Sequence, residues 1–287
     1  MSIPEAAAST FLSHDGLELA YHLVGTGKPL VCLPGGPMRA SAYLGDLGGL
    51  SAHRQLVLLD LRGTGDSAHP ADTATYRCDR QVADVEALRE ALGLDQIDVL
   101  AHSAGSSLAA LYLTQHPHRV GELVLITPGP RALGVQPTEQ DTLAAARLRE
   151  HEPWFAEAFA ALKAIWSGED SAENWAKAVP FFYGRWDTQA QAHAAADDAQ
   201  SNRAAGAIYG SSGAFDGAAI RKAFAARAEP VLVLGGAADG WPSPRVCTEY
   251  AALFPAATLA LQPAAGHFPW LDDPTWFTRT VAAFLAH

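Results

Sequence analysis

Short apolar runs alternate along the chain with segments whose apolar residues recur at helical spacing. The apolar runs that predict strands are residues 17–24, 29–33, 56–59, 97–100, 120–126, 230–234 and 258–261. Residues 80–92 place Val85 and Leu88 on one face of a predicted helix, and residues 103–115 predict another. Nearly continuous apolar strands separated by helices indicate a mostly parallel sheet covered on both faces. The first two of these strands are expected to form an antiparallel edge.

Residues 131–212 interrupt this alternation. They are rich in alanine, have helical patterning, and carry four of the seven tryptophans: Trp154, Trp166, Trp175 and Trp186. A helical segment inserted after one strand of a parallel sheet would cover the C-terminal strand ends, where ligands bind in open α/β sheets. We therefore predict a core of residues 1–130 and 213–287 with a helical cap, residues 131–212, over the active site. The alternative is a helical domain with no part in binding.

Composition and charge exclude several classes of function. The 287 residues, 49% of them hydrophobic, are enough for one large α/β domain or two small ones. The net charge of -11 and the lack of any Lys/Arg run argue against nucleic-acid binding. No segment approaches the roughly 18 uninterrupted apolar residues that a membrane span needs. Residues 1–5 have neither a basic start nor an apolar stretch, so no signal peptide is predicted.

The cysteines give no sign of a disulfide framework or a metal site. Cys32, Cys78 and Cys247 are odd in number, far apart, and without metal-ligand spacing. We expect buried, reduced thiols in a cytoplasmic protein. No metal or cofactor is predicted, the expected partner is a small-molecule substrate, and the sequence does not indicate the oligomeric state.

A serine between a predicted strand and a predicted helix is the first candidate for chemistry. Residues 101–105 read Ala-His-Ser-Ala-Gly and follow the strand at residues 97–100. Small residues two positions before and after Ser103 let strand and helix approach, which is the pattern of a nucleophile elbow. That pattern usually begins with Gly, and Ala101 is the next smallest residue. The elbow would expose the Ser103 hydroxyl at the C-terminal edge of the sheet.

A base and an acid follow later strands. His267 lies in a loop just after the last predicted strand, and Asp239 lies just after the strand at residues 230–234. Both are therefore expected at the sheet edge that carries Ser103, and their order along the chain is that of an α/β-hydrolase triad. Asp272 and Asp273 are nearer to His267 in sequence. They are predicted instead to open the terminal helix, with Asp273 as cap and Pro274 in the first turn.

Backbone amides for an oxyanion hole are expected near Pro-Gly-Gly-Pro at residues 34–37, directly after the strand at residues 29–33. Glycines let a backbone turn its N–H groups toward a developing negative charge. We predict the amides of Gly36 and Ala104 as the pair. The alternative for residues 34–37 is an ordinary Gly-Pro turn.

These motifs together resemble the α/β-hydrolase superfamily, and within it the proline iminopeptidase-like branch. The resemblance runs from about residue 17 to residue 284 and rests on residues 34–37, Asp-Leu-Arg-Gly-Thr-Gly-Asp-Ser at 60–67, the elbow, Asp239, and Gly-His at 266–267. It implies an α/β-hydrolase fold with a mostly parallel eight-stranded sheet, flanking helices and a helical cap. It also implies that Asp60 and Arg62 hold the 60–67 loop together without taking part in the reaction.

The resemblance implies a serine hydrolase that cleaves a small-molecule ester, thioester, lactone or amide through an acyl-enzyme. Two positions differ from the branch: Pro34 replaces the usual His, and the elbow differs from the Gly-Gly-Ser-Trp-Gly of true proline iminopeptidases. The elbow is closer to those of esterases. A proline iminopeptidase-like aminopeptidase, a cofactor-free haloperoxidase-like enzyme and a non-catalytic binding module are the alternatives.

The predicted cap contains an aromatic stretch at residues 181–187. The residues predicted to contact substrate are Phe182, Tyr183, Arg185, Trp186, Trp241 and Phe268. An aromatic wall with one cation could hold an apolar substrate by a polar anchor. The alternative is a packed cap core with a surface Arg–Asp pair. An aminopeptidase would also need an acid for the substrate amine, and the candidates are Glu157, Glu169, Glu173 and Asp187.

Overall fold

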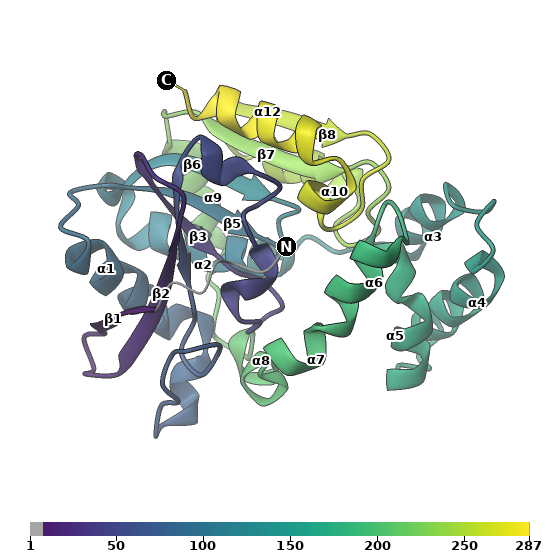
Figure 1. The fold of residues 1–287 in the computed structure, drawn as a ribbon, viewed down its shortest axis with the longest axis horizontal. Helices are drawn as coiled ribbons and strands as arrows, with labels where there is room; N and C mark the ends of the chain where they lie inside the picture. Colours follow the sequence, from purple (N-terminus) through teal and green to yellow (C-terminus); the bar gives the residue numbers. More distant parts are fainter. Residues whose placement is uncertain (1–7, 287) are drawn as a thin grey trace.

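An eight-stranded sheet forms the centre of the computed structural model, which describes residues 8–286. The strands are β1 (Ser9–Leu12), β2 (Glu18–Val24), β3 (Pro29–Leu33), β4 (Gln55–Leu59), β5 (Ile97–His102), β6 (Val120–Ile126), β7 (Val231–Gly236) and β8 (Ala257–Gln262). Their order in the sheet is β1-β2-β4-β3-β5-β6-β7-β8 (Figure 1). All pairs from β4 onward are parallel, which confirms the mostly parallel sheet. Residues 1–5, where no signal peptide is predicted, lie outside the described part.

The antiparallel edge differs from the prediction. It consists of β1 paired with β2 and β2 paired with β4, whereas β3 lies between β4 and β5 and runs parallel to both. The expectation that the first two predicted strands pair with each other is therefore wrong. The physical reason is burial: four of the five residues of β3 are buried, as an interior strand requires. The sequence did not predict β1, because Phe11 alone of its four residues is buried.

Helices cover both faces of the sheet. One face packs against α1 (Val82–Ala91), α2 (Gly105–Gln115), α9 (Gly217–Ala226) and α10 (Pro244–Ala251). The other packs against the short helices η1 (Ser41–Leu44) and η2 (Leu50–Ala52) together with α11 (Pro269–Asp272) and α12 (Pro274–Phe284). Val31 and Val57 face the first group, and Leu30 and Leu56 face the second. Because successive side chains on a strand point to opposite faces, both sets must be apolar, which explains the nearly continuous apolar runs.

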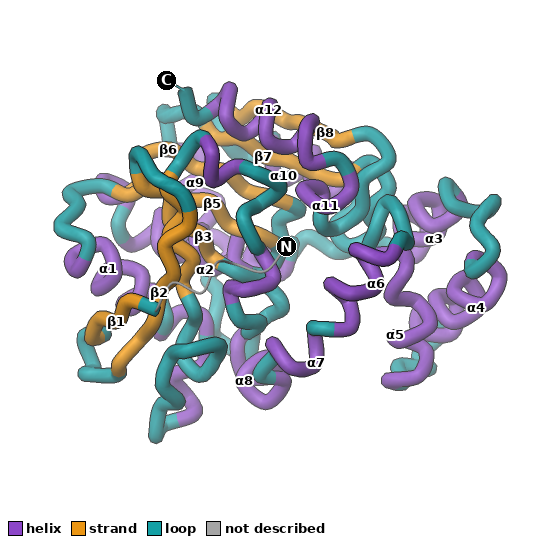
Figure 2. Tube along the Cα trace, in the orientation of Figure 1, coloured by secondary structure: helices purple, strands orange, loops and turns teal. Residues whose placement is uncertain are grey.

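Residues 131–212, called the insertion below, leave the sheet after β6. Their elements are η6 (Arg131–Leu133), α3 (Glu139–Arg147), α4 (Phe155–Trp166), α5 (Ala172–Ala178), η7 (Val179–Phe182), α6 (Thr188–Ala195), α7 (Asp197–Gln200) and α8 (Arg203–Tyr209). The side chains of Thr138, Ser171, Asp187 and Asn202 accept backbone N–H groups in the first turns of α3, α5, α6 and α8. These caps set where each helix begins. In Figure 2 the insertion consists of helices and loops, and α3 to α6 lie beside the sheet.

The remaining short helices lie in loops of the core. They are η3 (Thr73–Tyr76), η4 (Cys78–Arg80) and η5 (Pro117–Arg119). Cys32, Cys78 and Cys247 are buried and unpaired, as predicted, and burial raises the pKa of all three thiols. Within residues 8–286, no helix combines the length and apolar character needed to cross a membrane.

Candidate active site

The turn after β5 holds Ser103 in a strained conformation. Its φ of 52° lies in the left-handed region that non-glycine residues rarely adopt. Two backbone bonds fix the turn: the Ser103 amide donates to the Ile126 carbonyl (2.9 Å), and the Gly129 amide donates to the Ser103 carbonyl (3.0 Å). A Cβ on Gly105 would lie 2.5 Å from the Leu33 carbonyl oxygen. The small residue is therefore needed for the close approach of helix and strand that the elbow pattern predicts.

The structure brings Ser103, His267 and Asp239 into one hydrogen-bonded line. His267 Nε2 is 2.9 Å from Ser103 Oγ, and His267 Nδ1 is 2.8 Å from Asp239 Oδ2. Asp239 is fully buried, and its Oδ1 accepts the Trp241 amide at 2.8 Å. A carboxylate at Nδ1 favours the tautomer that leaves Nε2 free to accept the serine proton. Chemically, this line can deprotonate the Ser103 hydroxyl as it attacks a carbonyl.

Two backbone amides beside Ser103 have no partner. Within residues 8–286, neither the Gly36 N–H nor the Ala104 N–H donates a hydrogen bond. Gly36 has a φ of 115°, a conformation that favours glycine. A Cβ on the neighbouring Gly35 would lie 2.9 Å from Ser103 Cβ, so the 35–36 backbone passes directly beside the serine. The site therefore has two unused donors next to the hydroxyl.

Asp272 does not open the terminal helix, so that part of the prediction is wrong. Asp273 does cap α12, where its side chain accepts the Trp276 amide. Asp272 accepts the amides of Gly184 (2.9 Å) and Arg185 (3.1 Å) on Oδ1. Its Oδ2 accepts the Gly266 amide (2.8 Å), and burial raises the pKa of this carboxyl. Asp272 therefore joins the insertion to the loop of His267, a contact that no local sequence signal could show.

The insertion contacts the loops of the acid and the base directly. The His267 amide donates to the Phe182 carbonyl at 2.7 Å. The buried Arg149 guanidinium donates to the carbonyls of Tyr183 (3.0 Å) and Ala238 (2.6 Å). Burial lowers the pKa of Arg149. Arg149, which the sequence did not single out, thus connects the segment beside His267 to the residue before Asp239.

Of the predicted substrate-contact residues, Phe182 and Phe268 contact the His267 ring, and Trp241 packs on Phe182. The Phe182 ring is 5.9 Å from the His267 ring and stacks on Trp241 at 5.4 Å between centroids. Trp175, which was not predicted, lies 5.5 Å from Trp241. Phe268 is buried and packs edge-on against His267 at 5.3 Å. Phe182, Trp175 and Trp241 are half-buried and form an aromatic cluster beside the candidate base.

The other three lie farther from the reacting groups. Tyr183 is buried and packs on Trp186 at 5.3 Å, with its hydroxyl 2.8 Å from His193 Nδ1. Arg185 is exposed, donates to the Leu271 carbonyl (2.9 Å), and lies 3.8 Å from the Asp187 carboxylate. No hydrogen bond or ring contact joins Tyr183, Arg185 or Trp186 to Ser103, Asp239 or His267 within residues 8–286.

The 60–67 loop is held by buried ion pairs. Asp60 accepts the amides of Ser41 (2.7 Å) and Asp66 (3.0 Å) and lies 3.0 Å from His22 Nε2. Burial alone would raise the pKa of Asp60, but these bonds lower it. Arg62 donates to Asp84 at 2.8 Å through Nε. His22, Asp60 and Asp66 are close enough to share a cation, yet both Asp60 oxygens are already occupied by donors of the protein. This geometry fits the structural role that the resemblance implies.

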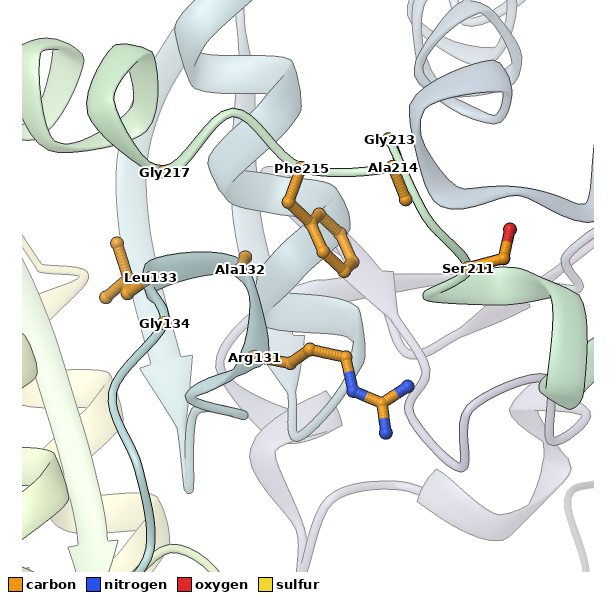
Figure 3. A pocket seen from close by; sticks show the side chains of 9 residues that line it. All are labelled: Arg131, Ala132, Leu133, Gly134, Ser211, Gly213, Ala214, Phe215 and Gly217. Atoms are coloured by element: carbon orange, nitrogen blue, oxygen red, sulfur yellow. The ribbon is translucent and has the colours of Figure 1, made fainter.

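A surface pocket lies where the insertion leaves and rejoins the core (Figure 3). Its lining residues are Arg131, Ala132, Leu133, Gly134, Ser211, Gly213, Ala214, Phe215 and Gly217. Residues 131–134 follow β6, and residues 211–217 lead into α9. Ser103, Asp239 and His267 are not among the lining residues, so this pocket is separate from the line of candidate reacting groups.

Curated relatives match parts of the chain. The proline iminopeptidase of Heyndrickxia coagulans is 38% identical over 104 residues, which cover 36% of this chain and 36% of that protein. The 2-hydroxy-6-oxo-2,4-heptadienoate hydrolase of Pseudomonas putida is 28% identical over 170 residues, covering 58% of this chain and 53% of that protein. The matched part thus spans between about a third and about half of the length of these relatives.

Solved structures share the fold over nearly the whole chain. An esterase from Exiguobacterium antarcticum superposes with a TM-score of 0.74 at 17% identity, covering 98% of this chain and all of that one. A proline iminopeptidase from Mycobacterium smegmatis gives a TM-score of 0.72 at 22% identity, covering 98% of each chain. The family model described as the alpha/beta hydrolase fold matches residues 28–274. The chain therefore belongs to the α/β-hydrolase family.

Proposed function

We propose that the protein is a serine hydrolase that cleaves a small-molecule ester, thioester, lactone or amide. The observation that carries the proposal is the line from Ser103 Oγ through His267 to Asp239, with both distances below 3 Å. The curated relatives named above include a peptidase and a hydrolase, which supports hydrolysis as the reaction class.

In the proposed mechanism Ser103 Oγ attacks the substrate carbonyl while His267 Nε2 takes its proton. Asp239 accepts a hydrogen bond from the Nδ1–H group of His267 and so stabilises the imidazolium that forms. The N–H groups of Gly36 and Ala104 stabilise the oxyanion of the tetrahedral intermediate. His267 then gives its proton to the leaving group, and an acyl-enzyme remains on Ser103. A water molecule, deprotonated by His267, attacks this ester, releases the acid and restores the serine.

We further propose that the insertion, residues 131–212, acts as the cap and contributes to substrate binding. The supporting observation is the aromatic cluster of Phe182, Trp175 and Trp241, of which the first two belong to the insertion. The Phe182 ring lies 5.9 Å from the ring of the candidate base, and a half-buried aromatic cluster at that place suits an apolar acyl or leaving group. Phe182 and Trp241 are the residues of this cluster for which contact with substrate was predicted from sequence.

The positions of the acids favour a neutral substrate over a peptide with a free amine. Glu157 and Glu173 have 72% and 77% of their side chains exposed, and both lie near Lys177. Asp187 caps α6, and Glu169 is exposed. Asp239 and Asp272, which do contact the triad loops, already accept hydrogen bonds on both oxygens. An aminopeptidase-like activity therefore remains the second candidate, supported by the relatives and not by these carboxylates.

A paired substrate test decides between these activities. We expect hydrolysis of p-nitrophenyl butyrate to exceed that of proline p-nitroanilide, and Ser103→Ala to lower kcat on the ester by about 10⁴-fold or more. Preference for the anilide, lost when its amine is blocked, would support the aminopeptidase instead. Halogenation that requires peroxide and an organic acid would support the haloperoxidase-like alternative. Full activity of Ser103→Ala would exclude the proposed nucleophile.

A further inference from the structure

Two buried polar side chains that the proposed mechanism does not use lie next to the reacting groups. Tyr43 on η1 is 4% exposed, and His102, directly before Ser103, is 2% exposed. The Tyr43 hydroxyl is 2.7 Å from His102 Nδ1 and accepts the Gly35 amide at 2.7 Å. His102 Nε2 is 2.9 Å from the His267 carbonyl oxygen. These contacts connect the Gly35–Gly36 backbone to the loop of the candidate base through two side chains.

The donor and acceptor in each of these hydrogen bonds follow from the last acceptor in the series, the His267 carbonyl oxygen. The His267 carbonyl can only accept, so His102 Nε2 must carry the proton. Burial lowers the pKa of His102 well below its usual range, so the ring holds one proton and Nδ1 is an acceptor. Tyr43 therefore donates its hydroxyl proton to Nδ1, and its oxygen is free to accept the Gly35 N–H. In this arrangement the Tyr43 hydroxyl and both His102 ring nitrogens each have a hydrogen-bond partner.

Together with the Arg39 amide, this arrangement fixes the direction of the Gly36 amide. Gly35 is held at both ends, because its N–H donates to Tyr43 and its carbonyl accepts the Arg39 amide at 3.1 Å. The peptide bond between Gly35 and Gly36 is planar and trans, so the Gly36 N–H points opposite to the Gly35 carbonyl. Holding the carbonyl toward Arg39 therefore turns the Gly36 N–H away from Arg39.

The insertion holds the Tyr43 ring in place. The buried Arg39 guanidinium lies 4.6 Å above that ring and donates to Gln200 Oε1 through Nε (2.9 Å) and Nη2 (2.8 Å). His193 Nε2 lies 3.2 Å from the Tyr43 carbonyl oxygen. The tyrosine is thus restrained from the insertion on one side and from the elbow on the other.

We propose that Tyr43 and His102 are positioning residues that aim the Gly36 amide at the oxyanion and at the same time fix the loop of His267. The proposal rests on the proposed function, because it assigns these residues to the oxyanion hole of the same site. A purely structural tyrosine would fill space and satisfy partners, and its hydroxyl would affect stability alone. The two accounts differ in what happens to the reaction when the hydroxyl is removed.

The test is Tyr43→Phe, which deletes one oxygen and leaves the ring. The Gly35 N–H and His102 Nδ1 then lose their partner, and the Gly35–Gly36 peptide is held only by the bond from the Arg39 amide to the Gly35 carbonyl. We expect the second-order rate constant for phosphorylation of Ser103 by diethyl p-nitrophenyl phosphate to fall by roughly 10- to 100-fold, somewhat less than for complete loss of an oxyanion donor. With p-nitrophenyl butyrate, kcat should fall similarly while KM changes by less than about twofold, as for an interaction made in the transition state.

Tyr250→Phe is the matched control. Tyr250 on α10 is fully buried, and its hydroxyl has no hydrogen-bond partner within the described residues. The same atom is removed from an equally buried ring, and both rate constants should stay at the wild-type value. A second pair of variants separates the bond to Tyr43 from the bond to the His267 carbonyl. In His102→Asn the side-chain oxygen can replace Nδ1 as the acceptor for Tyr43. In His102→Gln the amide nitrogen can replace Nε2 as the donor to the carbonyl. His102→Asn should therefore keep more of the phosphorylation rate than His102→Gln.

The outcomes distinguish this inference from the proposed function. Wild-type protein that is never phosphorylated at Ser103 contradicts the proposed function itself. Wild-type protein that is phosphorylated while Tyr43→Phe reacts at the same rate overturns the positioning role and leaves the function standing. A lower melting temperature of Tyr43→Phe with unchanged rates also overturns it, since that is the signature of a structural residue.

Discussion

The sheet core and the insertion hold the candidate site in different ways. The core buries two large apolar clusters, one on each face of the sheet, and its strand ends carry Ser103, Asp239 and His267. The insertion has a small cluster of its own, made of Ala146, Ala158, Leu162 and Phe181 with aromatic neighbours. In Figures 1 and 2 α3, α4 and α5 extend away from the sheet, whereas Ala205 and Tyr209 of α8 pack into one of the large clusters. The insertion has a small apolar core of its own, but it makes several hydrogen bonds to the loops around the serine.

Those hydrogen bonds reach every loop of the candidate site. The Ala40 amide donates to the Gln200 carbonyl (2.8 Å), and the Asn202 amide donates to the Met38 carbonyl (2.9 Å), beside the oxyanion loop. The His267 amide and Arg149 make the corresponding contacts at the base and the acid. The comparison teaches that strand ends carry the candidate reacting groups, whereas the insertion restrains the loops on which those groups lie. Changes in the two regions should therefore differ in kind.

The largest effect is expected from a substitution in the core that keeps the shape of the side chain. In Asp239→Asn the Trp241 amide still needs an acceptor, so the new NH₂ group must face His267 Nδ1. It then favours the tautomer with a proton on Nε2, which cannot accept the Ser103 proton. We expect kcat on p-nitrophenyl butyrate to fall by about 10⁴-fold, with the melting temperature changed by only a few degrees. A variant with more than a tenth of wild-type activity would refute the acid assignment.

A smaller effect is expected from a change in the insertion that moves a loop. A Cβ on Gly184 would lie 2.0 Å from the Ala264 carbonyl oxygen, so Gly184→Ala must displace the backbone beside His267. We expect a loss of roughly 1–3 kcal/mol in the free energy of unfolding. We also expect kcat to fall by about 10- to 100-fold, since small misplacements of reacting groups are costly. Urea denaturation and ester hydrolysis measure the two.

Gly217→Ala is the control for that variant. Gly217 is at the start of α9, and a Cβ there would meet its nearest atom at an ordinary 3.4 Å. The same substitution should leave kcat unchanged and stabilise the fold by a few tenths of a kcal/mol, up to about 1. Equal losses in the two alanine variants would show that the contact at Ala264 has no special part in holding the base.

The pH dependence of the free energy of unfolding tests the burial of His193, the insertion residue that contacts Tyr43. Burial lowers the pKa of His193 from 6.5 to about 4 in the folded protein. Between these values the unfolded chain binds a proton that the folded protein does not, so stability rises with pH and is lost as pH falls through this window. The contribution is about 1.4 kcal/mol per pH unit. We expect urea denaturation between pH 4.5 and 7 to show a shallower slope for His193→Gln. Identical slopes would contradict a buried neutral His193.

The smallest effect is expected at Arg185. Its side chain is 56% exposed and lies near Asp187, and its guanidinium donates a hydrogen bond to the Leu271 carbonyl. Arg185→Ala should change the free energy of unfolding by about 0.5 kcal/mol or less and leave KM for p-nitrophenyl butyrate within about twofold. A tenfold rise in KM would instead place Arg185 at the substrate, as the sequence predicted.

The sequence could predict the strands and the triad positions because both depend on local patterns. The runs at residues 29–33 and 120–126 are apolar wherever they are buried, and Asp239 and His267 each directly follow a strand. It could not predict the pairing of β1, whose four residues include the exposed Leu12. A short edge strand with one buried side chain has no periodic signal.

The contacts of the insertion with the core were beyond sequence reasoning for a different reason. Asp272 was predicted to open the terminal helix because it precedes the cap Asp273, yet its partners Gly184 and Arg185 lie 88 and 87 positions away. Arg149 and Arg39 are buried cations whose acceptors are mainly backbone carbonyls or a distant glutamine, and such partners leave no trace in the local pattern. His102 lies within the elbow motif, but nothing local in the sequence indicates Tyr43 as its partner.

The most direct test of the central claim is the site of phosphorylation by diethyl p-nitrophenyl phosphate. The reagent needs a nucleophilic serine, an activating base and oxyanion donors, and it needs no knowledge of the natural substrate. Peptide mapping of the intact chain after reaction should find a single adduct, on Ser103, and His267→Ala should carry none under the same conditions. An unmodified Ser103 in the wild-type protein, or equal modification of His267→Ala, would contradict the account.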